Sequence, residues 1–80
     1  MTKADFDMLL DRAVSGDVQS MRTMAMICFK MVEGATNNGD AESANMYMGL
    51  GDGWKLASEN GLKNAEQVKA LTITAFSNCF

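Results

Sequence analysis

The chain has 80 residues, a formal net charge of −3 and 48% hydrophobic residues, which suits one small folded domain and excludes a disordered tail. A chain this short buries only about 60–65% of its unfolded surface, so self-association would add to a thin stability margin. Seven scattered basic residues against ten acidic ones argue against direct binding of nucleic acid. The sequence lacks an apolar run long enough for a membrane span and an apolar signal core after Met1, so we expect a cytoplasmic protein that binds no membrane.

The hydrophobic spacing predicts four helices, over about residues 3–15, 17–34, 40–60 and 64–78. The first segment opens with a capping box, in which Thr2 is paired with Asp5 in place of the usual glutamate. Its apolar residues recur at the spacing of one helix face, and Gly16 is placed to end the helix. This pattern is typical of an all-α domain built as two stacked antiparallel helical hairpins.

The second segment, residues 17–34, has Asp17 as its expected N-cap. One side of this predicted helix is apolar and consists of Met21, Met24, Ala25, Cys28, Met31 and Val32. Met26 and Ile27 fall among the polar residues of the opposite side, so a simple amphipathic helix does not explain them. Residues 33–40, which contain two glycines and two asparagines, are predicted to form a loop.

The third segment, residues 40–60, contains three glycines between Gly49 and Gly53, each costing a helix about 1 kcal/mol relative to alanine. Either the helix breaks there, or the glycines allow another backbone to approach closely beside Trp54. We expect a continuous helix, because the apolar period stays in phase across the glycines. Its predicted apolar face consists of Met46, Tyr47, Leu50, Trp54 and Ala57.

The fourth segment, residues 64–78, follows Gly61 and offers a second capping box formed by Asn64 and Gln67. Its predicted apolar face consists of Ala65, Val68, Thr72, Ala75, Phe76 and Cys79. The chain contains no proline, which fits four uninterrupted helices.

Residues suited to catalysis are scarce. The chain has no histidine, the commonest general base near neutral pH, and its two cysteines, Cys28 and Cys79, lack the spacing of a metal site. Cys28 lies on an apolar helix face and is predicted to be a buried thiol. Asp52, beside Trp54, is the one acidic residue in an unusual setting. We therefore expect no enzyme, no cofactor and no metal ion.

Methionine is enriched, with eight in the chain. Met21, Met24 and Met31 have the spacing of core residues, whereas Met26 and Met48 are expected to project from polar faces, where methionine makes adaptable binding contacts. The predicted partner-binding residues are therefore apolar (Met26, Ile27, Met48 and Leu56, with Leu71 as a neighbour) and acidic (Asp40, Glu42, Asp52 and Glu59).

Two turns of the chain resemble those of the Sel-one-like repeat, a tetratricopeptide-related helical hairpin. The family pattern of small residues around a glycine is matched first by Ala13, Gly16, Ser20, Met24 and Ala25, and then by Ala57, Gly61, Ala65 and Ala70. The second copy departs from the pattern at Lys69, where the first has Met24. Trp54 comes one position late for the aromatic residue of the family, and Leu9 occupies that position in the first copy. The resemblance implies a protein-interaction scaffold without catalysis.

These features predict a non-catalytic protein that acts by stoichiometric binding to another protein. In size and charge the chain is similar to phage-encoded inhibitors, including anti-CRISPR proteins and antirepressors, whose acidic surfaces would occlude a nucleic-acid-binding partner. The alternative is a structural or adaptor module that assembles with itself, as a homodimer, and has no inhibitory target.

Overall fold

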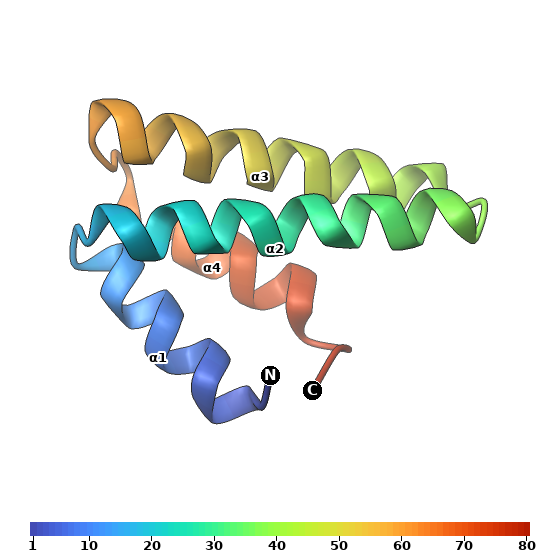
Figure 1. Ribbon diagram of the computed structural model, residues 1–80, viewed down its shortest axis with the longest axis horizontal. Coiled ribbons are helices and arrows are strands. Elements are labelled where there is room, and N and C mark those ends of the chain that lie inside the picture. Colours follow the sequence, from blue (N-terminus) through green and yellow to red (C-terminus); the bar gives the residue numbers. More distant parts are fainter.

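The computed structural model describes residues 1–80 as four α-helices and no strands, which confirms the predicted all-α class. The helices are α1 (Lys3–Val14), α2 (Val18–Asn37), α3 (Ala41–Asn60) and α4 (Ala65–Phe76). In chain order they form two antiparallel hairpins, α1 with α2 and α3 with α4. The most extensive packing, however, is between α2 and α3, which lie side by side along their full length (Figure 1). None of the four helices has the length and apolar character needed to cross a membrane.

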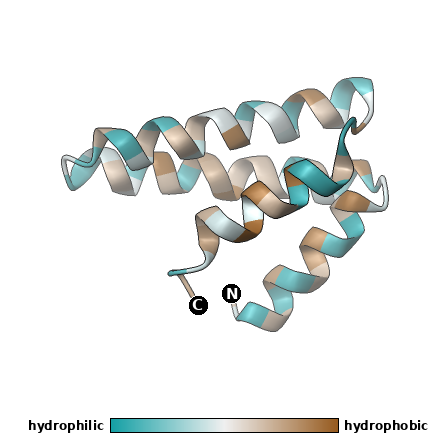
Figure 2. Cartoon of the chain, turned by 180° about the vertical axis from the view of Figure 1, so that it is seen from behind, coloured by the Kyte–Doolittle hydropathy of each residue, from teal (hydrophilic) through white to brown (hydrophobic).

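The two short helices lie on one side of the α2–α3 hairpin and leave its other side uncovered. In Figure 1, α4 passes behind α2 and emerges below it, and α1 lies below the start of α2. The reverse view in Figure 2 places α4 in front of the hairpin, with the two ends of the chain close together. The apolar core therefore lies between the hairpin and the short helices, and one face of α2 and α3 has no neighbour.

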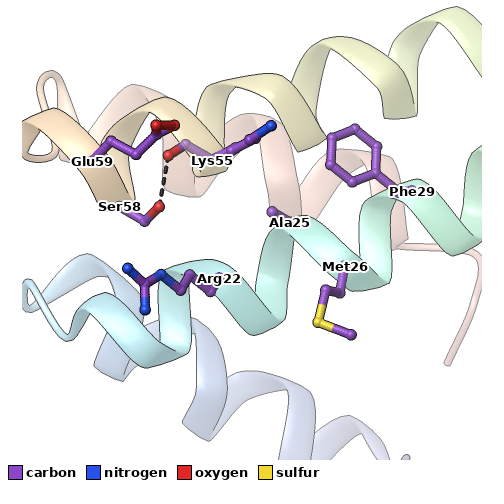
Figure 3. Close-up of a pocket in the computed structure, with 7 residues that line it drawn as sticks. All are labelled: Arg22, Ala25, Met26, Phe29, Lys55, Ser58 and Glu59. Atoms are coloured by element: carbon purple, nitrogen blue, oxygen red, sulfur yellow. Dashed lines mark hydrogen bonds between the residues drawn. The ribbon is translucent and has the colours of Figure 1, made fainter.

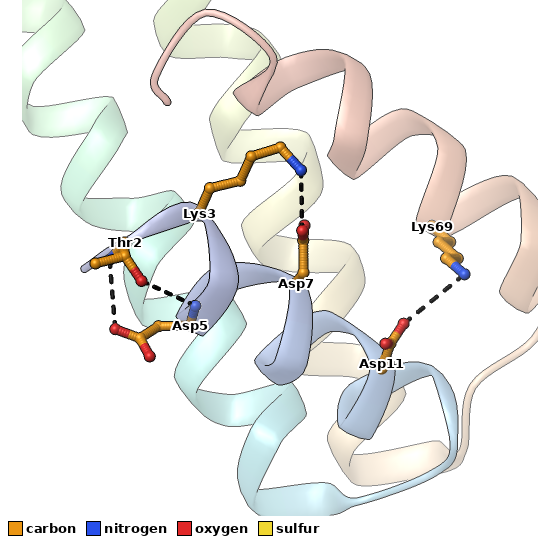
Figure 4. A network of polar contacts seen from close by, with 6 residues as sticks. All are labelled: Thr2, Lys3, Asp5, Asp7, Asp11 and Lys69. Atoms are coloured by element: carbon orange, nitrogen blue, oxygen red, sulfur yellow. Dashed lines mark hydrogen bonds and ion pairs between the residues drawn. The ribbon is translucent and has the colours of Figure 1, made fainter.

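Side-chain caps start α1 and α2 as predicted. The backbone N–H of Asp5 donates to Thr2 Oγ1 at 3.1 Å, and the Thr2 N–H donates to Asp5 Oδ2 at 3.4 Å (Figure 4). Asp17 accepts from the backbone N–H of Ser20 at 3.2 Å. Gly16 and Gly61, which follow α1 and α3, have φ angles of +103° and +91°, in the region that favours glycine.

Two predictions at helix ends, one boundary and one cap, are wrong. α2 continues to Asn37 instead of ending near residue 34, because Ala35 is buried and the Asn38 N–H still bonds to the Gly34 carbonyl at 3.1 Å. The predicted capping box at the start of α4 does not form. Asn64 takes a left-handed backbone with φ of +55° and makes no side-chain cap bond, whereas a capping side chain requires an extended backbone.

α3 is continuous across its glycines, as predicted, but the close approach involves one glycine and a side chain. A methyl group on Gly51 would lie 2.6 Å from the Cε1 atom of Phe29, whereas one on Gly49 or Gly53 would meet open space. The Phe29 ring of α2 therefore packs against the bare backbone of α3 at Gly51, which fixes the relative position of the two helices.

We predict that the three glycines respond differently to alanine. Gly49→Ala and Gly53→Ala each raise the free energy of unfolding by about 0.5–1 kcal/mol, because alanine favours the helix and touches nothing. Gly51→Ala lowers it, because displacing the Phe29 ring costs about 1–3 kcal/mol, more than the gain in helix propensity. Urea denaturation followed by circular dichroism measures all three, and a stabilised Gly51→Ala variant would contradict the packing.

The core centres on Trp54 and on aromatic residues from three helices. The indole Nε1–H of Trp54, which is fully buried, donates to Thr72 Oγ1 at 3.2 Å and so links α3 to α4. The Tyr47 hydroxyl donates to the Ala75 carbonyl at 2.8 Å. Met46 and Cys79, expected on the apolar faces, are exposed instead, and Cys79 lies beyond the end of α4 at Phe76. The core cluster comprises Phe6, Leu10, Ala13, Met21, Met24, Ala25, Cys28, Tyr47, Trp54, Ala57 and Phe76.

Candidate interaction surface

The uncovered side of the hairpin holds a groove of about 460 Å³ between α2 and α3 (Figure 3). Its lining residues are Arg22, Ala25, Met26 and Phe29 from α2, and Lys55, Ser58 and Glu59 from α3. Met48 lies seven residues, about two turns, before Lys55 and so on the same side of α3. We call the groove residues together with Met48 and the residues in line with them, Glu33 and Asp52, the open face.

The apolar part of the open face consists of Met26, Phe29 and Met48. The Met26 side chain is 65% exposed and Met48 is 43% exposed, whereas Phe29 is half-buried against Gly51. Methionine is flexible and polarisable, so exposed methionines beside an anchored aromatic ring can adapt to the surface of a partner. The open face therefore offers a small apolar centre for protein binding.

The charged residues of the groove have no partner within the chain. Arg22, Lys55 and Glu59 are exposed, and the two ion pairs of the structure lie elsewhere, between Lys3 and Asp7 at 2.9 Å and between Lys69 and Asp11 at 3.8 Å (Figure 4). Cations and an anion thus flank the apolar centre and are free to pair with groups of a partner.

The predicted apolar contact residues do not share one surface. Ile27 is half-buried and packs against the core, so it is not a contact residue of the open face. Leu56 is 58% exposed, but it lines a different cavity, of about 350 Å³, together with Gly53 and Val68. Leu71 is exposed on α4. Of the predicted apolar residues, only Met26 lines the groove, and Met48 lies on the same side of α3 as the groove residue Lys55.

The four predicted acidic residues all belong to α3 or its N-cap. The helix contains one basic residue, Lys55. Asp40 caps the helix by accepting from the Ser43 N–H at 3.1 Å, and hydrogen bonds from the Ser43 side chain and backbone lower the pKa of Asp40. Glu42 lies in the first turn, where a negative charge suits the helix dipole. Asp52 and Glu59 are exposed seven residues apart, on the side of the open face.

The sequence prediction missed Arg22, Phe29, Lys55 and Ser58. Their signal was present in the spacing, because Arg22, Met26 and Phe29 follow one another at intervals of four and three residues on one side of a helix. The single apolar side predicted for residues 17–34 includes neither Arg22 nor Phe29. The pairing of α2 with α3 brings these residues into one groove.

Cys28 is fully buried, as predicted, and Cys79 is exposed. Burial raises the pKa of the Cys28 thiol from 9.0 to about 12. Burial, followed by the neighbouring Cys79, raises the pKa of Tyr47 from 10.0 to about 12. The folded chain therefore favours the neutral thiol and phenol. No three Cys, Asp or Glu side chains lie together as a metal-binding group.

We predict a loss of stability in alkali. Because the folded pKa values exceed the unfolded ones, the contribution of Cys28 and Tyr47 is complete below pH 9 and is lost as the pH rises toward 12. Urea denaturation at a series of pH values should show this decline. In Cys28→Ala the decline should begin nearer pH 10, where Tyr47 of the unfolded chain starts to ionise, and an unchanged profile in that variant would contradict the role of the thiol.

The small residues that carry the resemblance to the Sel-one-like repeat occupy unequal positions in the fold. Ala13, Ser20 and Ala25 are buried, whereas their counterparts in the second copy include the half-buried Ala65 and the exposed Ala70. Comparison of the chain with protein-family models, with curated proteins and with solved structures found no match.

Proposed function

We propose that this chain is a non-catalytic protein-interaction protein that acts by stoichiometric binding through the open face. The observation that carries the proposal is the groove itself, in which the exposed Met26 lies beside the unpaired charges of Arg22, Lys55 and Glu59. Exposed apolar area rimmed by charge is typical of protein-binding surfaces. The repeat-like order of the two hairpins, which resembles the Sel-one-like repeat, supports a scaffold role.

The chain's own nucleophiles and bases support a non-catalytic role. Cys28 is buried with a raised pKa, so its thiolate is scarce at neutral pH and closed to substrates. Asp52 is exposed on α3, and Glu59, the one carboxyl group that lines the groove, lies seven residues or about 10 Å further along the helix. Binding without chemistry regulates a partner by occlusion or by shifting its conformational equilibrium.

The first candidate partner is a basic, nucleic-acid-binding protein, which the chain would inhibit by occupying the binding groove. The concentration of acidic residues on α3 favours this candidate, because Asp40, Glu42, Asp52 and Glu59 place negative charge along one helix. This is the mode expected of a small phage-type inhibitor.

The second candidate is self-assembly without an inhibitory target. The mixed charge of the groove favours it, because a surface that carries both Arg22 and Glu59 unpaired can complement a copy of itself.

The proposal is tested by affinity capture from cells that express the chain, with matched variants. Met26→Glu places a charge in the centre of the open face, whereas Leu71→Glu makes the same change at an exposed residue of α4. We expect partner capture in equimolar amounts by the wild-type chain and by Leu71→Glu, with at least a tenfold loss for Met26→Glu. Equal capture by all three chains would contradict the proposal, provided that circular dichroism shows each to be folded.

A further inference from the structure

One line of residues along α2 has a symmetric pattern. Arg22, Met26, Phe29 and Glu33 follow at intervals of four, three and four residues, so they lie on one side of the helix over three turns. Arg22, Met26 and Glu33 are exposed and Phe29 is half-buried. The line has a cation at one end, an anion at the other and two apolar residues between them. Read in the opposite direction, the intervals are the same.

This symmetry makes the line complementary to itself in an antiparallel arrangement. When two copies of α2 meet in opposite directions, Arg22 of each lies opposite Glu33 of the other. Met26 of each then lies opposite Phe29 of the other, so both apolar residues are covered at the centre. A partner with charge of one sign would meet a like charge at one end of the line.

α3 supports the same arrangement. Because Phe29 contacts Gly51 and Met26 shares the groove with Lys55, the middle of the α2 line lies beside the part of α3 that holds Asp52 and Lys55. A two-fold rotation that reverses α2 on α2 also reverses α3 on α3. It brings Lys55 of one copy near Asp52 of the other. The centre of this α3 pair lies within about one residue of the axis that the α2 pairing defines. Neither residue has an ion pair within its own chain.

We infer that the open face binds the open face of a second copy of this chain, related by a two-fold axis that runs across α2 and α3. The dimer is a sandwich of two hairpins with Met26 and Phe29 at its centre and four Arg22–Glu33 and Lys55–Asp52 pairs around it. Interfaces of this isologous kind repeat each contact twice. The inference rests on the proposed function, because it names the partner of the same surface.

Charge reversal tests the inference. Arg22→Glu and Glu33→Arg each place like charges opposite one another in a homodimer, twice per interface, so each variant should dimerise with a Kd at least tenfold higher than the wild type. An equimolar mixture of the two variants restores both pairs across a heterodimer. Sedimentation equilibrium from about 1 µM to about 1 mM should therefore show association in the mixture close to that of the wild type. Lys63→Glu, an exposed control in the turn before α4, should dimerise like the wild type.

The outcomes separate the two proposals. A mixture that associates no better than the single variants, or single variants that dimerise like the wild type, would overturn the antiparallel pairing. A monomer at every concentration would also overturn it, but would leave the proposed function intact if Met26→Glu still lost capture of a foreign protein. If either Arg22→Glu or Glu33→Arg fails to fold by circular dichroism, the pair Asp52→Lys and Lys55→Asp gives the same test on α3.

Discussion

Trp54→Ala is expected to unfold most of the chain at room temperature. Trp54 is a fully buried side chain at the junction of α3 and α4, and truncating such a residue costs about 3–5 kcal/mol. A single core in a chain of this size rarely supplies more than about 3–5 kcal/mol, so the loss is comparable to the whole stability. Circular dichroism in the absence of denaturant should show a large loss of helix signal.

Milder variants separate the packing of Trp54 from its hydrogen bond. Thr72→Val leaves the buried indole N–H without a partner, and should lower the free energy of unfolding by about 1–3 kcal/mol. Thr72→Ser keeps the hydroxyl and should lose less. In the Trp54→Phe background, which has no N–H, Thr72→Val should cost less than in the wild type. An equal cost in both backgrounds would show that the bond between Trp54 and Thr72 contributes nothing.

Phe76→Ala is expected to have an effect of similar size, and to release α1 from α4. Phe76 is 3% exposed, and its ring centroid lies 4.9 Å from that of Phe6 on α1 and 5.3 Å from that of Tyr47 on α3. Truncation removes all of these contacts and should lower the free energy of unfolding by about 3–5 kcal/mol. Urea denaturation measures the loss, and hydrogen exchange should show early loss of protection in α1.

Phe80→Ala is the matched control for this cluster. The Phe80 ring also lies near Phe6, at 5.2 Å between centroids, but its side chain is 48% exposed. Its truncation should therefore cost about 1 kcal/mol or less. A loss as large as that of Phe76→Ala would mean that the end of the chain carries as much of the core as α4 does.

The four helices, and the caps that start α1 and α2, could be predicted from the sequence because their signals are local. Helix starts are determined by side-chain caps a few positions away, those of Thr2 with Asp5 and of Asp17. Helix ends are marked by glycines with a positive φ, Gly16 and Gly61. The end of α2 could not be predicted in this way, since the helix extends past residue 34 with Ala35 buried, and burial depends on the tertiary structure. The difference in packing among Gly49, Gly51 and Gly53 depends likewise on a distant residue, Phe29, more than twenty positions before Gly51.

The candidate surface was only partly predictable for the same reason. Met26 and Met48 stood out as apolar residues among polar ones, and both are exposed on the open face. Ile27 gave the same local signal but is partly buried and packs against the core, a contact that depends on the tertiary structure. The contributions of Arg22 and Phe29 depended on which faces of α2 and α3 meet, a property of the tertiary structure.

The central claim, that the open face is the binding surface of this chain, is tested most directly by methionine methyl NMR across a dilution series. Met26 and Met48 lie on the open face, whereas Met8 and Met46 are exposed elsewhere and serve as internal controls. The account predicts that the methyl signals of Met26 and Met48 shift with concentration while those of Met8 and Met46 stay constant. Shifts at Met8 or Met46, with Met26 unchanged, would contradict it.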